Sequence, residues 1–462
     1  MGEKLSVPHM YFRPQPESYD ISALDNNMTN LKKLSFAIAT TLLSTQTFAA
    51  GFQVNAQSAN GIGRAWSGDA AIADNAAVLA RNPAAMSMFK KRAFSGGITY
   101  AATDVEVRDV AWKTAPVSFG HNDSAAESKA IPNLFYIHPY SDKIAFGVGL
   151  FSNFGTGTDN KVILEQNPDR VMPTDLLGNT EVTTINLNGS ISYKINEHVS
   201  LGFGLDIIRG GGKLSRKTTD PRQFPVCIKN TPNGDCQNVD LVNVDATGWG
   251  IGGIVGALFQ LNENNRWGIS YRVSPEFKAK GDLDLFAGGL TPASFDELIL
   301  PLPNIFQVAG FHQVNDKFAV HYTAKLTQWS RFDQITLKGG KLGKNPVPDR
   351  PLKVYEWKDS WLYSVGGTYT INDTWKVRAG YMFDNSVIDK ITSISLPDSD
   401  RNWYTAGVSY KLNESSTIDF GYANVRGKYT KVDEYSKPAN ANAIAFTKGS
   451  ANYFSVQYSR EF

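Results

Sequence analysis

The sequence predicts an all-β fold, namely a transmembrane antiparallel 14-stranded β-barrel with a small, partly helical N-terminal hatch in its lumen. Three observations predict this fold. Apolar and polar residues alternate over strand-length segments, the connections alternate between short turns and long loops, and aromatic residues follow several short turns. Length alone does not decide the fold, because 462 residues can also form two or three soluble domains.

Alternation with a period of two recurs throughout the chain after residue 90. The segment 183–195 is a clear example, and similar segments begin at Phe318, Trp375 and Tyr404. A soluble β-sandwich also has strands with one apolar and one polar face, so alternation alone leaves that fold open. The predicted strands have about ten or more residues, whereas sandwich strands usually have about five or six. Strand length therefore favours a barrel.

The predicted connections alternate strictly in length. Long loops are expected at 103–129, 154–179, 214–246, 281–300, 333–353, 386–400 and 433–447. Short turns are expected near 140–142, 195–198, 262–265, 313–316, 371–373 and 411–414. Short periplasmic turns and long external loops are typical of bacterial outer-membrane barrels, and these connections give an even number of strands, fourteen.

Aromatic residues follow several of the short turns. They are Phe146, Trp267, Phe318 and Trp375, and we expect them to form a girdle at the membrane interface. The near-balance of 46 basic and 44 acidic residues gives no electrostatic reason to expect a nucleic-acid partner.

An export signal starts inside the chain, at Met28. Lys32 and Lys33 precede a short apolar run, and cleavage is expected after Ala49. The run is too short to span a bilayer, which takes about 20 apolar residues. Residues 1–27 have no export features, and we interpret them as a non-native upstream extension produced by a mis-assigned start.

These boundaries divide the chain into four parts. After the extension and the signal peptide of residues 28–49, a hatch is expected at 50–91 and the barrel at 92–462. The hatch does not alternate. It has Ala-rich, helix-compatible pieces around 70–80 that end before Asn82-Pro83, because proline prevents a helix from continuing.

Cys227 and Cys236 are the only cysteines. They lie nine positions apart in a polar stretch, and the export signal directs the chain to an oxidising compartment, so we expect a local disulfide. A zinc site is the alternative, but none of the six histidines falls in that stretch. We therefore expect no metal and no cofactor.

The predicted hatch closely resembles that of the FadL long-chain fatty-acid transporters (the OmpP1/FadL/TodX family). The matching motifs are Gly51-Phe52-Gln53, Gly61-Ile62-Gly63-Arg64-Ala65-Trp66-Ser67-Gly68, Ala71-Ile72-Ala73-Asp74-Asn75 and Asn82-Pro83-Ala84. The resemblance continues through Phe318-Ala319-Val320-His321-Tyr322, Trp329-Ser330 and Pro397-Asp398-Ser399-Asp400-Arg401-Asn402-Trp403-Tyr404.

The resemblance implies passive uptake of long-chain fatty acids across the outer membrane of a Gram-negative cell. A fatty acid is captured between outer loops, held in an internal pocket and released sideways through a gap in the wall as the hatch moves. The expected partners are this ligand and outer-membrane lipid, with no nucleic acid, and the chain is expected to be monomeric. The first alternative is a channel for monoaromatic or other hydrophobic compounds. The second is a barrel lipase, although no GxSxG motif is present.

The resemblance also implies site residues. Ser152, Arg216 and Lys353 match the carboxylate site, and Phe52, Asn82, Pro83 and Ala84 match the hatch and gate. The capture groove is expected between loops 214–246 and 281–300, with Leu285, Phe286, Leu290, Phe295, Leu298 and Ile299.

Alternation provides a check on two of these residues. It turns Arg216 toward the lumen if its strand stays regular, and it turns Ser152 outward unless the strand of Ser152 is kinked. The family has a kink in this strand, and Gly147, Gly149 and Gly155 permit one.

Overall fold

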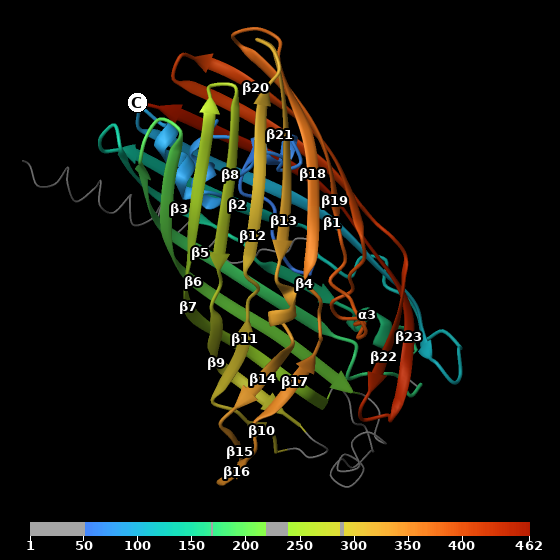
Figure 1. Cartoon of the computed structure of the whole chain (residues 1–462). Helices are drawn as coiled ribbons and strands as arrows, with labels where there is room; N and C mark the ends of the chain where they lie inside the picture. The colour runs from blue at the N-terminus through green and yellow to red at the C-terminus, as the bar shows by residue number, and fades with distance from the viewer. Residues whose placement is uncertain (1–50, 168–169, 219–238, 287–290) are drawn as a thin grey trace, which may run out of the picture. The chain divides into compact units, whose positions relative to one another are not determined.

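The computed structural model describes residues 51–167, 170–218, 239–286 and 291–462 (Figure 1). The expected extension, the signal peptide, Leu290 and both cysteines lie outside these residues. Among the described residues, no helix is both long and apolar enough to cross a membrane.

Antiparallel strands form the wall, which closes where β1 pairs with β23. The wall has fourteen strand positions, as the sequence predicts. Six of these positions are filled by two consecutive strands. In order they are β1 (Ala93–Trp112), β2 (Lys129–Pro139), β3 (Ile144–Phe151) with β4 (Gly155–Asp159), β5 (Asn179–Lys194), β6 (Val199–Thr218), β7 (Val239–Asn262), β8 (Asn265–Val273) with β9 (Glu276–Leu285), β11 (Glu297–Pro301) with β12 (Ile305–Gln313), β13 (Phe318–Thr327) with β14 (Gln334–Lys338), β17 (Arg350–Val354) with β18 (Ser360–Thr370), β19 (Trp375–Asp384), β20 (Arg401–Asn413), β21 (Ser416–Gly427) with β22 (Thr430–Ser436), and β23 (Ala441–Glu461).

The short strands β10 (Ala293–Ser294), β15 (Gly340–Leu342) and β16 (Asn345–Val347) extend the sheet beyond β9 and β14. Of two short helices, α3 (Lys161–Gln166) lies in the external connection between β4 and β5, and η3 (Trp329–Arg331) lies between β13 and β14. Several strands run further into the external connections than the sequence predicts. β1 continues to Trp112 and β6 to Thr218, because outside the membrane both faces of a hairpin are wet and the apolar alternation is lost.

The two faces of the wall carry opposite chemistry. In β5 the side chains of Leu187 and Ile191 are exposed, whereas those of Asn186 and Asn188, on either side of Leu187, are fully buried. A water-soluble sheet buries its apolar face, and here the apolar face points outward. The outer surface of the wall therefore faces lipid and its polar side chains face the lumen.

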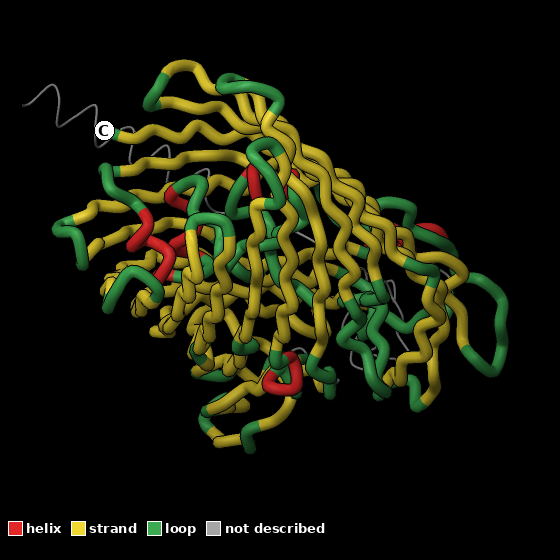
Figure 2. Tube along the Cα trace, turned by 45° about the horizontal axis from the view of Figure 1, so that its top comes forward, coloured by secondary structure: helices red, strands yellow, loops and turns green. Residues whose placement is uncertain are grey.

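The chain before β1 lies inside the barrel. It contains α2 (Ala59–Gly63), η1 (Ala76–Ala80) and η2 (Pro83–Met88), and most of its side chains are buried. These helices contact wall strands on different sides of the lumen. α2 contacts β19, β20, β21 and β23, η1 contacts β1, β2 and β3, and η2 contacts β5, β6 and β7. Figures 1 and 2 show them surrounded by strands near the C-terminal end of the chain. We call residues 51–92 the hatch.

Glycines of the wall allow the hatch to pack against it. A Cβ added at Gly202 of β6 meets the backbone of Pro83 and Ala84, and one added at Gly256 of β7 meets the Asn82 side chain. A side chain at either position displaces η2.

Gly202→Ala is therefore expected to destabilise the barrel by about 1–3 kcal/mol, the usual cost of overpacking. The matched control is Gly189→Ala, because a Cβ at Gly189 meets nothing within 4 Å. Urea unfolding of both variants in lipid vesicles checks this prediction. Equal stability of the two variants contradicts the packing of η2 on the wall.

Candidate functional site

A cavity of about 650 Å³ lies at the external end of the barrel, where β6, β7, β9 and β17 meet the outer connections. Its apolar lining comes mainly from these strands and the residues beside them. These residues are Leu176, Leu214, Leu241, Val242, Leu285, Phe286, Pro351, Leu352, Val354, Ile391 and Pro438.

Cations outnumber carboxylates in this external cavity. The five cations are Arg216, Arg350, Lys353, Lys390 and Lys437, against the three carboxylates Asp175, Asp433 and Glu434. A net positive lining attracts an anionic group and keeps it in the cavity.

Arg216 is held in place by oxygen atoms. Its guanidinium donates to the carbonyl oxygens of Asn179 at 2.6 Å and Asp175 at 3.1 Å, and to the Thr180 hydroxyl at 2.8 Å. Lys353 forms an ion pair with the buried Glu434. Among the described residues, Arg216 thus has only neutral oxygen partners at hydrogen-bonding distance, whereas Glu434 neutralises the charge of Lys353.

Tyr355 adds a hydroxyl close to this cavity that sequence reasoning missed. Its side chain is almost fully buried, and its hydroxyl has no hydrogen-bond partner among the described residues. Burial raises the pKa of this hydroxyl, so Tyr355 stays a neutral donor at physiological pH, and the Arg216 guanidinium acts on that pKa in the opposite direction. Its position two residues after Lys353 was the available signal, but alternation carries no information at the border of a loop.

A buried apolar cluster continues from the cavity into the barrel. It includes Leu214 and Leu285, which line the cavity, and an aromatic group formed by Phe52, Phe154, Trp329, Phe332, Tyr355 and Trp357. The ring of Phe52 lies 4.7 Å from that of Trp329 and 4.9 Å from that of Phe332. The lumens of barrel channels are usually polar. One apolar cluster here connects the external cavity to the hatch residue Phe52.

The wall is interrupted next to this aromatic group. β2 starts at Lys129, but its pairing with β3 ends at Leu134↔Leu150, and no pairing joins β2 to β4 among the described strands. From Phe151↔Asn186 to Gly155↔Thr183 the chain advances four residues against three on β5, so it bulges. β2 therefore keeps its ladder with β1 over residues 129–133 but has no ladder there on the side of β3 and β4.

The first residues of the hatch pair with the chain at this interruption. Gln53 and Phe154 form an antiparallel bridge, with Val54 N–H donating to Asn153 at 2.7 Å and Gly155 N–H donating to Phe52 at 2.8 Å. The strand-like start of the hatch thus occupies the inner side of the interruption.

Asn82 ties the hatch to the opposite wall. Its side-chain amide donates to the carbonyl oxygens of Ala70 at 2.7 Å and Ala257 of β7 at 3.0 Å, and its oxygen caps η2 by accepting from Ala84 N–H. Pro83 takes the first position of η2, where the missing N–H has no cost. The predicted helix stop at Asn82-Pro83 is also the start of a new helix.

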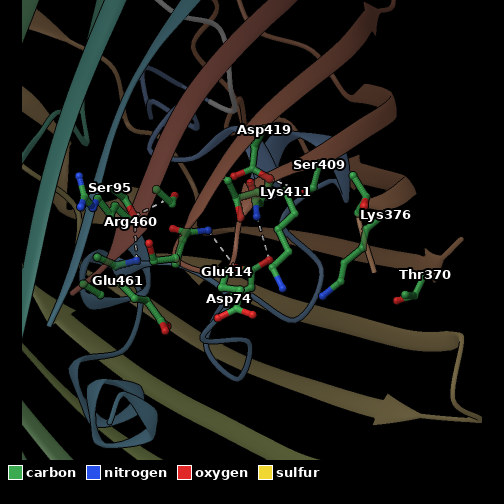
Figure 3. A pocket seen from close by; sticks show the side chains of 18 of the residues that line it. Asp74, Ser95, Thr370, Lys376, Ser409, Lys411, Glu414, Asp419, Arg460 and Glu461 are labelled. Atoms are coloured by element: carbon green, nitrogen blue, oxygen red, sulfur yellow. Dashed lines mark hydrogen bonds between the residues drawn. The ribbon is translucent and has the colours of Figure 1, made fainter. Parts of the chain in front are cut away.

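Ion pairs fix the rest of the hatch. Arg64 pairs with Asp69 at 2.9 Å and Asp74 at 3.1 Å, Arg81 pairs with Asp69 at 3.2 Å, and Arg378 of the wall pairs with Asp74 at 3.4 Å. Asp74 also borders a second cavity, of about 670 Å³, at the end of the barrel where the short turns and Glu461 lie. Figure 3 shows its polar lining, with Ser409, Lys411 and Asp419 from the wall. This polar cavity suits water and not an alkyl chain.

Comparison with known proteins decides the family. The model described as "Outer membrane protein transport protein (OMPP1/FadL/TodX)" matches residues 40–462. The chain belongs to this family. It is similar to the "Long-chain fatty acid transport protein" of Escherichia coli strain K12, at 31% identity over 88% of this chain and 94% of the relative. It is also similar to "Outer membrane protein P1" of Haemophilus influenzae strain Rd, at 30% identity over 90% of this chain and 95% of that protein.

Solved structures share the fold. A FadL homologue from Pseudomonas aeruginosa matches with a TM-score of 0.75 and 24% identity, over 89% of this chain and all of that one. The toluene transporter TodX from Pseudomonas putida matches with a TM-score of 0.63 and 20% identity, over 90% and 100% of the two chains. This FadL-family chain is therefore an outer-membrane β-barrel transport protein.

The FadL-family resemblance names residues that the structure only partly brings together. Arg216 and Lys353 line the same cavity. Ser152 is buried but does not line it, and its hydroxyl donates to the Phe154 carbonyl oxygen at 3.2 Å. The bulge turns Ser152 inward, as the kink predicts, and its backbone accepts a hydrogen bond from Gln57 of the hatch. Ser152 thus belongs to the wall interruption.

Most of the residues expected in the outer groove are described. Leu285 and Phe286 line the cavity, and Leu285, Phe295 and Leu298 belong to the apolar cluster. Ile299 is also buried.

Proposed function

We propose that this channel takes up long-chain fatty acids without an energy source. A fatty acid enters at the external cavity, lies along the apolar cluster and leaves sideways at the wall interruption. The observation that carries the proposal is that one buried apolar cluster joins a cavity with surplus cations to an interruption in the wall. The similarity to fatty acid transport proteins supports the same cargo.

Burial of the alkyl chain drives entry. Each methylene moved out of water contributes about 0.8 kcal/mol, so a sixteen-carbon chain gains on the order of 12 kcal/mol before costs. The carboxylate opposes entry, because an unpaired buried charge costs several kcal/mol. A cargo of this kind therefore needs cations and hydrogen-bond donors at the head of an apolar path.

We assign the carboxylate to Arg216, Lys353 and Tyr355. The two cations line the cavity, and the nearby Tyr355 hydroxyl is buried and has no hydrogen-bond partner among the residues that the structure describes. Tyr355 replaces Ser152 as the hydroxyl donor in this proposal, because the Ser152 hydroxyl already donates to Phe154 at the interruption. Leu285 and Phe286 guide the chain into the cavity, as expected of the capture groove.

Sideways release requires the hatch to move. Residues 52–54 pair with the chain at the interruption, so an alkyl chain reaches lipid there only after this pairing breaks. The rest of the hatch is held by Asn82 and by ion pairs to the wall. We infer that the residues near Phe52 move while Asn82 and Pro83 act as the hinge.

Asn82→Ala is expected to slow oleate uptake without reducing oleate binding at the external cavity. The substitution removes the cap of η2 and two hydrogen bonds, which misplaces the hinge but leaves the cavity intact. Uptake of radiolabelled oleate by cells and binding of oleate to purified protein measure the two effects separately. Equal loss of uptake and binding contradicts the hinge.

Uptake tests the proposal itself. The gene is expressed in a Gram-negative strain that lacks its own fatty acid transporter, and entry of radiolabelled oleate and of toluene is compared with an empty vector. We expect oleate uptake to be restored. The aromatic group around Phe52 also suits a monoaromatic compound, which is the second candidate. Restored toluene entry without oleate uptake assigns the channel to that cargo.

A further inference from the structure

Three neighbouring strands place two cations and a tryptophan side by side on the outer surface of the wall. The pairing of β6 with β7 puts Arg209 beside Trp249, and the pairing of β7 with β9 puts Trp249 beside Lys278. All three side chains are exposed, and the Arg209 guanidinium lies 5.4 Å from the centre of the Trp249 ring. We call these three residues the Arg–Trp–Lys row. Figure 1 shows β6, β7 and β9 together on one side of the barrel.

The row lies at the outer edge of the apolar belt. One step toward the short turns, β5, β6 and β7 expose Leu187, Ile207 and Ile251, which face lipid chains, and β9 exposes Glu276. One step toward the external loops, Thr247 stands beside Lys280. The Arg–Trp–Lys row therefore lies where the hydrocarbon ends and the headgroups of the outer leaflet begin.

The two cations of the row have no acidic partner in the part of the chain that the structure describes. Neither has a carboxylate within 4 Å among the described residues, whereas nearby Lys213 pairs with Asp245 at 3.0 Å and Lys280 with Glu297 at 3.3 Å. On the sides away from Trp249, Arg209 stands beside Ile185 and Lys278 beside Ile299, and both neighbours are apolar. Glu276 is exposed on β9, but it lies two residues further along the strand, on the side of the apolar belt.

We propose that the Arg–Trp–Lys row binds a phosphate of an outer-leaflet glycolipid such as lipid A. Two strand spacings of about 4.8 Å separate the backbones of the two cations, so their long side chains can converge on one phosphate. The exposed Trp249 ring offers a face for the sugar, and the acyl chains lie over the apolar belt. Free phosphate has no group for the ring or the belt, so the site selects a phosphorylated lipid.

The opposite side of the barrel offers a matched control. Arg426 of β21 is also exposed and lies 5.6 Å from the Tyr404 ring centre, so it is a second outward cation over an aromatic residue. It stands alone, because its neighbours across the sheet are Asn402 and Ser450, and the next strand places Asp104 beside Ser450. A single cation in a row with a carboxylate is expected to hold lipid phosphate poorly.

The test compares wild type, Arg209→Gln with Lys278→Gln, and Arg426→Gln, each purified from outer membranes in mild detergent. Mass spectrometry measures the lipid A retained per protein. We expect a loss of about tenfold or more in the double variant and little change in Arg426→Gln, because two charge-assisted contacts are removed. Equal retention in all three proteins overturns the proposal.

A second measurement keeps the proposal testable if the double variant does not fold. Lipid-free wild type is titrated with lipid A, with lipid A whose phosphates have been removed, and with inorganic phosphate, and its unfolding temperature is followed. Only intact lipid A is expected to raise that temperature. An equal rise with the dephosphorylated lipid shows that the cations are not used, and a rise with inorganic phosphate shows a simple anion site. Either result contradicts the proposal.

Discussion

Replacing Arg216 and Lys353 together with alanine is expected to weaken oleate binding by about two orders of magnitude. A buried carboxylate without cations costs several kcal/mol, and each 1.4 kcal/mol corresponds to a tenfold change in affinity. Both residues line the external cavity, and without them the surplus of cations there is lost. Titration of the purified variant with a fluorescent fatty acid measures the affinity directly.

Two controls separate this effect from a general loss of structure. Lys213→Ala removes a cation from the same strand as Arg216, but Lys213 is exposed and pairs with Asp245 outside the cavity. It is expected to leave oleate affinity unchanged. An uncharged alkyl alcohol is expected to bind the double variant as tightly as it binds wild type. Unchanged oleate affinity in the double variant contradicts the carboxylate site.

A disulfide between the hatch and the wall is expected to abolish uptake. Gln53 and Phe154 form a bridge of the non-hydrogen-bonded kind, because the flanking residues make the hydrogen bonds. Such pairs have Cα atoms about 4.5 Å apart, within the range that a disulfide tolerates. Gln53→Cys with Phe154→Cys, in a chain whose two native cysteines are replaced by serine, therefore locks the start of the hatch against the interruption.

The reduced form of the same variant is its own control. Oleate uptake by cells is expected to fall to the level of an empty vector under oxidising conditions and to recover after reduction. Oleate binding at the external cavity is expected to persist in the oxidised form. Equal uptake by the oxidised and the reduced forms means that the hatch start does not control the exit.

The barrel follows from local sequence pattern. Lipid outside and polar side chains inside impose a period of two on every strand, so the segments around Leu187, Tyr322 and Tyr404 could be read without any tertiary information. The alternation of short turns and long loops then gives the number of strands. The lengths of the external strands could not be predicted, because the alternation fades where both faces meet water.

Alternation also places some site residues. It turns Arg216 toward the lumen, where the structure confirms a buried side chain. It turns Ser152 outward, and only the bulge after Phe151 brings that residue inside. The glycines near Ser152 permit a bulge, but the missing ladder between β2 and β4 depends on pairing between distant segments.

The internal path lies beyond what local pattern can show. Phe52 meets Trp329 and Trp357, which are close in space but about 300 residues away along the chain. Tyr355 lies at the border of a loop, where neither the apolar–polar alternation nor a sequence motif predicts whether its side chain faces the lumen. Contacts of this kind arise only when the barrel closes around its own N-terminal segment.

Diffraction from crystals grown with palmitate brominated at its last carbon locates both ends of the bound fatty acid, because bromine marks the far end of the chain. We expect the carboxylate beside Arg216 and an anomalous peak in the aromatic group around Phe52 and Trp329. Palmitate elsewhere in the barrel, or in the cavity with its bromine beside Arg216, contradicts a path that runs from the external cavity to the wall interruption.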